Sequence, residues 1–187
     1  MIYIIRHGQT ELNTRRVLQG RSDYPLNETG ISQAEAARKK LENVSFSRVY
    51  SSPLIRAVQT AGIIVPHLKP SLDRRLIEMD YGPYEGMSLK TLAPEVLTFF
   101  SDFIHNPAPD GMETLESVVD RAQEFMMEMC RTGETVLIST HAIAMKGILE
   151  FLTPESHGSY WTKYIGNCAI FGTLYRNGTF SVPFEID

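Results

Sequence analysis

The sequence predicts an α/β fold, a three-layer sandwich in which a mostly parallel central sheet has helices on both faces and a small lid insert. Three short apolar runs have the length and the β-branched or aromatic content of buried strands, namely residues 1–5, 46–50 and 135–140. Three segments with helical spacing of apolar residues alternate with these runs, namely residues 29–41, 52–61 and 114–131. Strands that alternate with helices are typical of a parallel sheet covered on both faces.

Local start signals position the first two of these helices. Thr29 is predicted to cap the first helix, and the strands on either side of it then form a βαβ unit. Ser52 is predicted to cap the second helix, with Pro53 at the first helical position, where a proline loses no hydrogen bond. Arg56 therefore falls in the first turn of that helix.

The whole chain, residues 1–187, is predicted to form one domain. A chain of 187 residues with 43% hydrophobic content is long enough to bury one sizeable core. Residues 72–111 contain several glycines and prolines, which favour short helices and loops. We therefore expect residues 80–112 to form a lid region inserted over the main sheet.

The C-terminal part of the chain is predicted to form a β-hairpin. Asn177-Gly178 is a strong signal for a tight turn, because both residues tolerate the backbone conformation that such a turn needs. The strands on either side are expected at residues 168–175 and 179–184.

Composition and charge argue against several classes of function. The net charge of -4 argues against general nucleic-acid binding, because phosphate backbones are held by basic surfaces. The apolar runs are too short to span a bilayer, so we expect a cytoplasmic protein with no membrane partner. Cys130 and Cys168 lack CxxC spacing, so we expect two buried free thiols and neither a disulfide nor a zinc site.

Unusual polar residues stand at three strand-to-helix junctions. Arg6 and His7 follow the first strand, Arg56 follows the second, and His141 follows the strand at 135–140. In open α/β sheets, ligands bind outside the carboxyl ends of the strands, where helix N-termini also direct backbone donors outward. The three junctions therefore predict a pocket for an anion.

The residue types at these junctions suit a phosphate and chemistry upon it. Arg6 and Arg56 offer planar donors that stay charged at any working pH. A neutral imidazole such as that of His7 is a good nucleophile, and His141 can stabilise charge on the transferring group. Either histidine alone is equally consistent with a satisfied polar residue at a strand end, but their joint occurrence beside two arginines argues against that interpretation.

Short motifs follow one another along nearly the whole chain. They are, in order, Arg6-His7-Gly8-Gln9-Thr10 with Asn13, Gln19-Gly20 with Asp23 and Pro25-Leu26, Gly30 with Gln33-Ala34, Ser51-Ser52-Pro53-Leu54 with Arg56-Ala57 and Gln59-Thr60, Glu78 with Tyr81-Gly82 and Glu85-Gly86, Gly111 with Glu113-Thr114, and the strand that ends at His141. In this order they resemble the signature of the histidine phosphatase superfamily, in its phosphoglycerate mutase-like branch.

The resemblance implies a role for each matching residue. It makes His7 the residue that is phosphorylated, with Arg6, Arg56 and His141 around the phosphoryl group. It makes Glu78 the proton donor to the leaving oxygen, because an alkoxide leaves poorly unless a nearby acid protonates it.

Two further sets of residues complete these expectations. The resemblance implies that three residues contribute phosphate or substrate contacts, namely Asn13, Gln19 and Gly20. Asp80 and Glu85 are rival acids to Glu78, although a solvated or structural role is the favoured interpretation for each.

The expected function is a phosphate monoester hydrolase that acts on a small phosphorylated metabolite through a phosphohistidine. The alternative is a cofactor-dependent phosphoglycerate mutase. Mutases of this superfamily generally carry extra basic residues in the middle insert, whereas residues 89–111 contain only Lys90, so hydrolysis is favoured. Sugar phosphates, phosphoglycerates and nucleotide-like monoesters all remain open as substrates, as does assembly into a homodimer.

Two other classes of protein, a metal-dependent hydrolase and a phosphate-binding module without activity, fit the sequence less well. A metal-dependent hydrolase would use His7, His141 and Glu78 as ligands, but Arg6 and Arg56 would repel a divalent cation. We therefore expect no metal and no cofactor. A phosphate-binding module without activity would keep the arginines but could lose the nucleophile or the acid, and the sequence retains all five of these residues.

Overall fold

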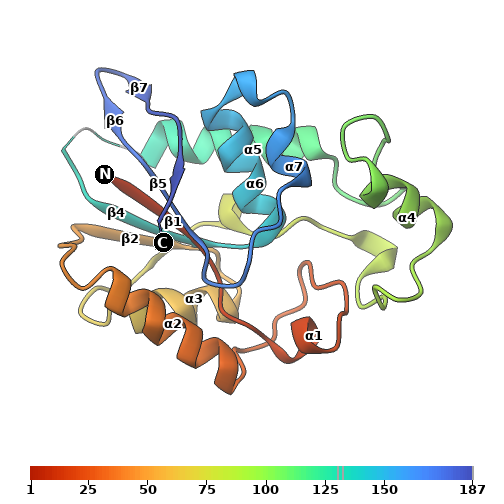
Figure 1. The fold of residues 1–187 in the computed structure, drawn as a ribbon, viewed down its shortest axis with the longest axis horizontal. Coiled ribbons are helices and arrows are strands. Elements are labelled where there is room, and N and C mark those ends of the chain that lie inside the picture. The colour runs from red at the N-terminus through yellow and green to blue at the C-terminus, as the bar shows by residue number, and fades with distance from the viewer. Residues whose placement is uncertain (130, 132, 187) are drawn as a thin grey trace.

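The computed structural model describes residues 1–129, 131 and 133–186, and its centre is a six-stranded sheet with strand order β3-β2-β4-β1-β5-β8 (Figure 1). The strands are β1 (Ile2–Arg6), β2 (Arg48–Ser51), β3 (Ser71–Leu72), β4 (Val136–Thr140), β5 (Ile170–Thr173) and β8 (Phe184–Glu185). The four strands from β3 to β1 run parallel, and β5 is antiparallel to both of its neighbours. The predicted α/β fold with a mostly parallel sheet is confirmed.

The order of the strands differs from the predicted βαβ unit in one respect. β4 lies between β1 and β2, so the two strands that flank the first long helix are parallel but are not neighbours. All five residues of β4 are buried. A strand that is apolar on both of its faces belongs in the middle of a covered sheet, and β4 therefore takes that place.

Helices cover both faces of the sheet (Figure 1). α2 (Glu28–Lys40) and α3 (Ile55–Ile64) pack on one face, and α5 (Leu115–Met129) and α6 (Ala142–Leu152) pack on the other. Neighbouring strand residues point to opposite layers. Ile4 and Ile138 belong to the apolar cluster between the sheet and the helices α5 and α6. Ile5 and Leu137 belong to the cluster on the other face, between the sheet and the helices α2 and α3.

The N-terminal caps of α2 and α3 differ from those predicted. Asn27, not Thr29, caps α2, and its side chain accepts a hydrogen bond of 2.8 Å from Gly30 N–H. α3 begins two residues after Pro53, and its first amide, of Ile55, donates to Asp23 Oδ1 at 2.6 Å. A loop that is distant in sequence thus caps α3. Arg56 still falls in the first turn, as predicted.

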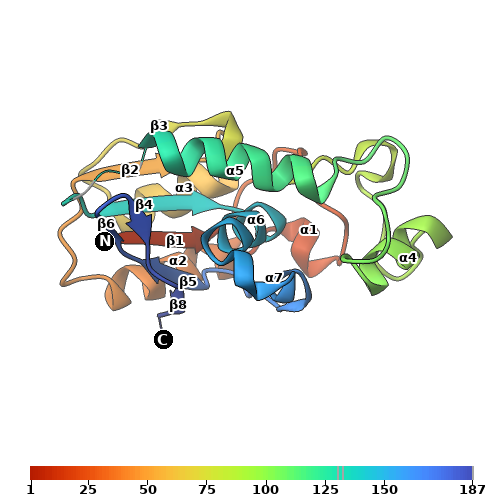
Figure 2. The same ribbon diagram turned by 90° about the horizontal axis from the view of Figure 1, so that it is seen from above.

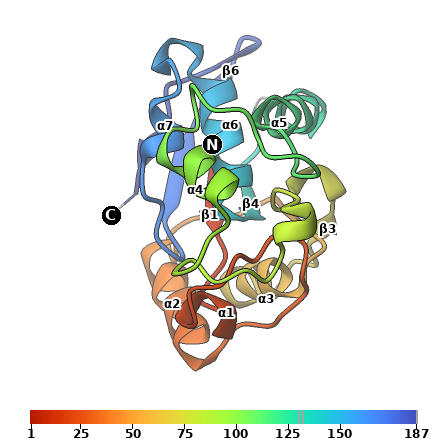
Figure 3. The same cartoon turned by 90° about the vertical axis from the view of Figure 1, so that its right-hand side faces the viewer.

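The segment between α3 and α5 consists of short helices and loops, as predicted. It contains η1 (Arg74–Leu76), η2 (Gly82–Tyr84) and α4 (Pro94–Ser101). α4 lies beyond the carboxyl ends of the parallel strands (Figures 2 and 3). Phe99 of α4 is buried in a third cluster with Met112 and Trp161, which joins this insert to the main body. The role of residues 80–112 as a lid stays a prediction.

The remaining elements are short. They are α1 (Glu11–Thr14), η3 (Pro154–Ser156), α7 (Ser159–Thr162), β6 (Tyr175–Arg176) and β7 (Thr179–Phe180). β6 and β7 pair across the predicted hairpin turn, in which Asn177 and Gly178 have φ of 52° and 81°. The predicted hairpin strands were too long, because residues 170–173 join the main sheet as β5.

The structure tests two expectations from composition, namely that the cysteines are buried free thiols and that no segment spans a membrane. Cys168 is a free, half-buried thiol, and burial raises its pKa to about 12. Cys130 lies outside the described residues. No helix in the described part of the chain is long and apolar enough to cross a membrane.

At Gly30, the backbone of α2 packs closely against the loop after β1, and substitution of this glycine tests that packing. A Cβ at Gly30 would lie 2.1 Å from the carbonyl oxygen of Gln9, whereas a Cβ at Gly62 in α3 would have no atom within 4 Å. Gly30→Ala should therefore lower the free energy of unfolding by about 1–3 kcal/mol. Gly62→Ala, its matched control, should raise it by about 0.5–1 kcal/mol. Urea unfolding measures both, and a neutral Gly30→Ala would contradict the close packing of α2 on the loop after β1.

Candidate active site

The three predicted junctions meet at one edge of the sheet. His7 follows β1, His141 is the N-cap of α6 directly after β4, and Arg56 lies in the first turn of α3. β1 and β4 are parallel neighbours in which Arg6 is paired with Thr140, so the residue after each strand is a histidine. The two imidazole rings lie 5.1 Å apart between centroids, at an angle of 60°. The structure thus brings His7, His141 and Arg56 together.

The hydrogen bonds of His7 define its tautomer. Nδ1 lies 2.7 Å from the carbonyl oxygen of Gly8, which can only accept, so Nδ1 carries the proton. Nε2 is 3.2 Å from Arg56 Nε, which can only donate, so Nε2 presents its lone pair. Burial, together with the charges of Arg56 and Arg6, lowers the pKa of His7 well below its usual range. The imidazole is therefore neutral, with Nε2 as its basic atom.

Arg56 is fully buried and makes three hydrogen bonds through its guanidinium. Besides the one to His7, Nη1 donates to Ser22 O and Nη2 donates to Gly20 O, each at 2.7 Å. Burial lowers its pKa to about 10, against the opposing effect of the carboxylates of Glu78, Asp23 and Glu85. Arg56 remains charged at neutral pH, and backbone carbonyls fix its orientation.

Glu85 holds the loop that supplies these carbonyls. Its carboxylate accepts from the backbone N–H groups of Gly20, at 3.0 and 3.1 Å, and of Ser22, at 3.2 Å, and also from the Ser22 hydroxyl. The contacts of Glu85 are therefore those of a structural carboxylate. They also explain Gly20, whose N–H faces Glu85 and whose carbonyl faces Arg56, and where a Cβ would lie 2.5 Å from Met79 O.

His141 contacts the side chain of Ser52 as well as the ring of His7. His141 Nε2 lies 2.7 Å from Ser52 Oγ, and that hydroxyl oxygen already accepts from Leu54 N–H at 3.3 Å. When the Ser52 hydroxyl donates to Nε2, the proton of His141 lies on Nδ1, which is buried without a hydrogen-bond partner. Burial, then the positive charge of Arg56, lowers the pKa of His141 well below its usual range.

Glu78 lies buried against the N-terminus of α6. Its Oε1 accepts from the backbone N–H groups of Met79, Ile143 and Ala144, at 2.9 to 3.1 Å, and Oε2 accepts from Ile143 at 3.2 Å. The positive end of the α6 dipole stabilises a negative charge at this place. The negative charge of Glu78 raises the pKa of both Arg6 and Arg56, against the larger effect of burial. Its rival Asp80 is instead paired with Arg21 at 2.8 Å.

Several buried donors around these residues have no acceptor among the residues that the structure describes. Among the buried side-chain atoms without a partner are Arg6 Nε, Gln19 Nε2 and His141 Nδ1. Arg6 Nη1 donates a hydrogen bond to Ile165 O, at 2.5 Å, and burial lowers the pKa of Arg6. Unpaired buried donors are costly, and an anion supplies the acceptors that they lack.

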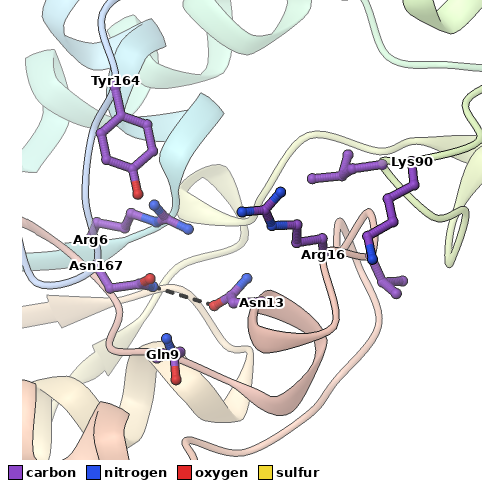
Figure 4. Close-up of a pocket in the computed structure, with 9 residues that line it drawn as sticks. Arg6, Gln9, Asn13, Arg16, Lys90, Tyr164 and Asn167 are labelled. Carbon is purple, nitrogen blue, oxygen red and sulfur yellow. Dashed lines mark hydrogen bonds between the residues drawn. The ribbon is translucent and has the colours of Figure 1, made fainter.

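A cavity of about 470 Å³ borders this region at Arg6 (Figure 4). It is lined by Arg6, Gln9, Asn13, Arg16, Val17, Leu89, Lys90, Tyr164 and Asn167. Arg6 directly precedes His7 in the sequence. Sequence reasoning missed Arg16, Tyr164 and Asn167, because each is in a loop whose position no periodic pattern reveals.

The residues predicted to contact phosphate or substrate have different surroundings. Asn13 lines the cavity, and its Oδ1 accepts from Thr10 N–H at 3.1 Å and from Asn167 Nδ2 at 3.3 Å. Gln19 is buried, and its Oε1 accepts from the Thr10 hydroxyl at 2.6 Å. Gly20 has both backbone polar groups occupied, as described above. A contact of any of the three with substrate stays a prediction.

The sequence offers a metal site with His7, His141 and Glu78 as ligands as an alternative. Within residues 1–129, 131 and 133–186, no group of three or more His, Cys, Asp or Glu side chains is placed to hold a metal ion. The oxygens of Glu78 accept from backbone N–H groups, His7 Nε2 accepts from Arg56, and His141 Nε2 lies against the Ser52 hydroxyl.

Comparison with known proteins gives the class to which this site belongs. The family model of the histidine phosphatase superfamily (branch 1) matches residues 2–184. The chain is 43% identical over 138 residues to the fructose-2,6-bisphosphatase TIGAR of Xenopus tropicalis, a match that covers 68% of this chain and 49% of that protein. It is 31% identical over 183 residues to a probable phosphoglycerate mutase, GpmB, of Yersinia pestis, and the match covers 94% and 85% of the two chains.

A solved structure supports the same fold. A phosphoserine phosphatase mutant from Entamoeba histolytica, in complex with phosphoserine, superposes with a TM-score of 0.88 at 24% identity, over 100% of this chain and 96% of that chain. Because the family model spans nearly the full sequence, the chain belongs to the histidine phosphatase superfamily. It spans about half the length of the TIGAR relatives that it matches.

The buried, neutral histidines predict how stability depends on pH. Their pKa values are lowered in the folded state, while an unfolded chain restores them to about 6.5. Below that pH the unfolded state binds more protons, so the free energy of unfolding falls as the pH falls. His141→Gln removes one of these groups and should lose less stability than the wild type between pH ~7.5 and ~5.5. Denaturant unfolding at both pH values measures this, with the exposed His67→Gln as the control, and equal losses in wild type and His141→Gln would contradict it.

Proposed function

We propose that this protein hydrolyses the phosphate monoester of a small phosphorylated metabolite through a phosphohistidine at His7. The observation that carries the proposal is the orientation of His7: its Nδ1–H is bound to Gly8 O, so that Nε2 presents a lone pair beside buried positive charge. A neutral imidazole held in this tautomer is a ready nucleophile.

In the first step, His7 Nε2 attacks the phosphorus atom. The P–N bond forms as the ester P–O bond breaks, and the electron pair leaves on the ester oxygen. Glu78, in its protonated form, gives its proton to that oxygen and becomes a carboxylate. The N–H groups of Met79, Ile143 and Ala144 then hold this carboxylate, as they do in the structure.

Positive charge and unpaired donors stabilise the transferring group. Arg6 and Arg56 offer permanently charged N–H groups, and His141 offers Nδ1–H. Such donors are fixed before the reaction begins, so that they stabilise the added charge without reorganisation. This supports a site in which the protein's own cations carry the electrostatic part of catalysis.

In the second step, water takes the place of the departed alcohol. The Glu78 carboxylate accepts a proton from the water, whose oxygen bonds to phosphorus. The P–N bond breaks, its electron pair returns to Nε2, and inorganic phosphate is released. Glu78 is then protonated again, so the cycle closes without any other acid or base.

Relatives support small phosphorylated metabolites as the substrate class. One is named a fructose-2,6-bisphosphatase and another, by its structure, a phosphoserine phosphatase. These names differ in substrate but share a phosphate monoester on a small molecule. Location in the cytoplasm and assembly into a homodimer stay predictions, which cell fractionation and size-exclusion chromatography would test.

A mutase is the second candidate, because one relative is named a probable phosphoglycerate mutase. Given 3-phosphoglycerate and 2,3-bisphosphoglycerate together, the protein should release phosphate faster than it interconverts 2- and 3-phosphoglycerate. The insert contributes one basic residue, Lys90, to the cavity, whereas mutases of this superfamily generally carry several there. The ratio of the two initial rates is the measurement. Fast interconversion with little phosphate release would reverse the ranking.

Substitution of the nucleophile and the acid separates their roles. His7→Ala should abolish covalent labelling by a radiolabelled phosphate ester. Glu78→Gln should still label His7 with an aryl phosphate, whose leaving group needs little protonation, but should slow hydrolysis of an alkyl phosphate by about 10²–10⁴-fold. Rapid quench followed by peptide mapping measures both effects.

Controls distinguish chemistry from folding in this experiment. Glutamine at position 78 places an amide near backbone donors, so unfolding curves must accompany the kinetics. Loss of fold would depress aryl and alkyl rates equally, whereas loss of the acid depresses the alkyl rate selectively. Label on a serine or aspartate, or turnover in His7→Ala near that of the wild type, would overturn the proposal.

A further inference from the structure

We propose that Arg121 and Glu113 are positioning residues for the acid Glu78, because together they hold the backbone on both sides of it. The proposal rests on the proposed function, since it takes Glu78 to be the group that gives and accepts the proton. Neither Arg121 nor Glu113 has a step of its own in that reaction. Their role is to fix the place of the Glu78 carboxyl group.

Glu78 lies on a segment without regular secondary structure. η1 ends at Leu76 and η2 begins at Gly82, and the residues 77–81 between them form no helix or strand. The segment is nevertheless buried, with Glu78 4% exposed and Met79 fully buried. Buried backbone groups need hydrogen-bond partners, and here no ladder of a helix or a sheet supplies them. Side chains from elsewhere in the fold must therefore position this segment.

Arg121 binds the backbone before Glu78. Its Nη1 donates to Ile77 O at 2.6 Å and to Arg75 O at 2.7 Å. On its other side, Nε donates to Glu113 Oε1 at 2.8 Å and Nη2 donates to Glu113 Oε2 at 3.3 Å. One arginine can make all these bonds because its planar guanidinium presents five N–H groups in fixed directions.

Glu113 binds the backbone after Glu78. Its Oε2 accepts from Asp80 N–H at 3.0 Å, and its own N–H donates to Asp80 O at 2.8 Å. The side chains of Glu113 and Arg121 are only 8% and 14% exposed, so water screens their ion pair little. A single shielded ion pair thus joins the backbone on the two sides of the acid.

The pair is anchored to a long helix of the main body. Arg121 belongs to α5, which lies along one face of the sheet (Figure 1). Glu113 stands two residues before α5 begins, and its Oε1 also accepts from the Ser117 hydroxyl at 3.1 Å. The helix therefore fixes both members of the pair, and through them it fixes the irregular segment that carries Glu78.

The protonation cycle of Glu78 gives this arrangement a use. As a carboxylate, Glu78 accepts from the N–H groups of Ile143 and Ala144 at the N-terminus of α6. A protonated carboxyl group is neutral, so these donors and the helix dipole hold it less strongly. Glu78 must be protonated when the first step begins, and its backbone must then keep it in place. The ion pair takes no part in the proton transfer, so it holds the segment in both states.

Glu113→Gln tests the proposal with little change of shape. A glutamine amide has one acceptor oxygen, and its NH₂ group would face a donor that the carboxylate now accepts from. The kcat/KM for an alkyl phosphate should fall about tenfold to 100-fold, while that for an aryl phosphate should change less than about threefold. A loss confined to the poor leaving group locates the defect at the acid.

Two further variants give a replicate and a matched control. Arg121→Lys keeps the charge, but one ammonium group cannot replace the fork that reaches both Glu113 and Ile77 O, so it should show the same selective loss. Glu128→Gln removes another ion pair of α5, with Arg75 at 2.6 Å, and should leave both rates unchanged. Equal losses for alkyl and aryl phosphates in Glu113→Gln would show a merely structural role and would overturn the proposal.

A double substitution separates failure of this proposal from failure of the proposed function. If the pair acts through the acid, adding Glu113→Gln to Glu78→Gln should cause no further selective loss for the alkyl phosphate. Selective loss in Glu78→Gln with none in Glu113→Gln would overturn the positioning role.

If Glu78→Gln itself causes no selective loss, the acid assigned in the proposed function is wrong. The crystal structure of Glu113→Gln then decides whether the pair positions Glu78. Loss of the hydrogen bonds between Glu78 and Ile143 N–H would support positioning, and an unchanged Glu78 would overturn it.

Discussion

The burial of the Arg56 guanidinium is the constraint on which the rest of the site depends. A permanently charged group can be buried only if its donors have acceptors and opposite charge lies nearby. Here the acceptors are His7 Nε2 and two carbonyls of the loop after Gln19, and Glu85 holds that loop in place. The Glu85 carboxylate therefore positions Arg56, and Arg56 orients His7, through a chain of hydrogen bonds.

The main features of the sheet and the meeting of His7, His141 and Arg56 could be predicted because they follow from local patterns. β1 and β4 are short apolar runs, and the residue after each is a histidine, so parallel pairing alone brings His7 and His141 together. Arg56 was placed correctly although the start of α3 was not, because two residues of error still leave it in the first turn. Residues that lie just after a strand can therefore be assigned to the site even when the predicted start of the next helix is wrong by two residues.

The features that were missed depend on contacts between segments distant in sequence. Asp23 caps α3 from a loop thirty-two residues earlier, and nothing in the local sequence of α3 indicates this partner. Arg16 and Lys90 line the same cavity because the segment after α1 pairs with residues 87–89 of the insert. Counting basic residues within the insert alone therefore understates the charge of the cavity. The place of β4 between β1 and β2 likewise follows from competition among strands for burial.

The position of β1 within the sheet has a consequence for how the protein folds. Residues 2–6 pair with residues 136–140 on one side and with residues 170–173 on the other. During synthesis β1 thus has no partner in the sheet until residues 136–140 have been made. Non-local pairing of this kind slows folding, and it leaves Ile2, Ile4 and Ile5 exposed to other chains meanwhile. The strand that ends next to His7 is the one whose pairing must wait longest, so the cluster around His7 forms only when nearly all of the sheet does.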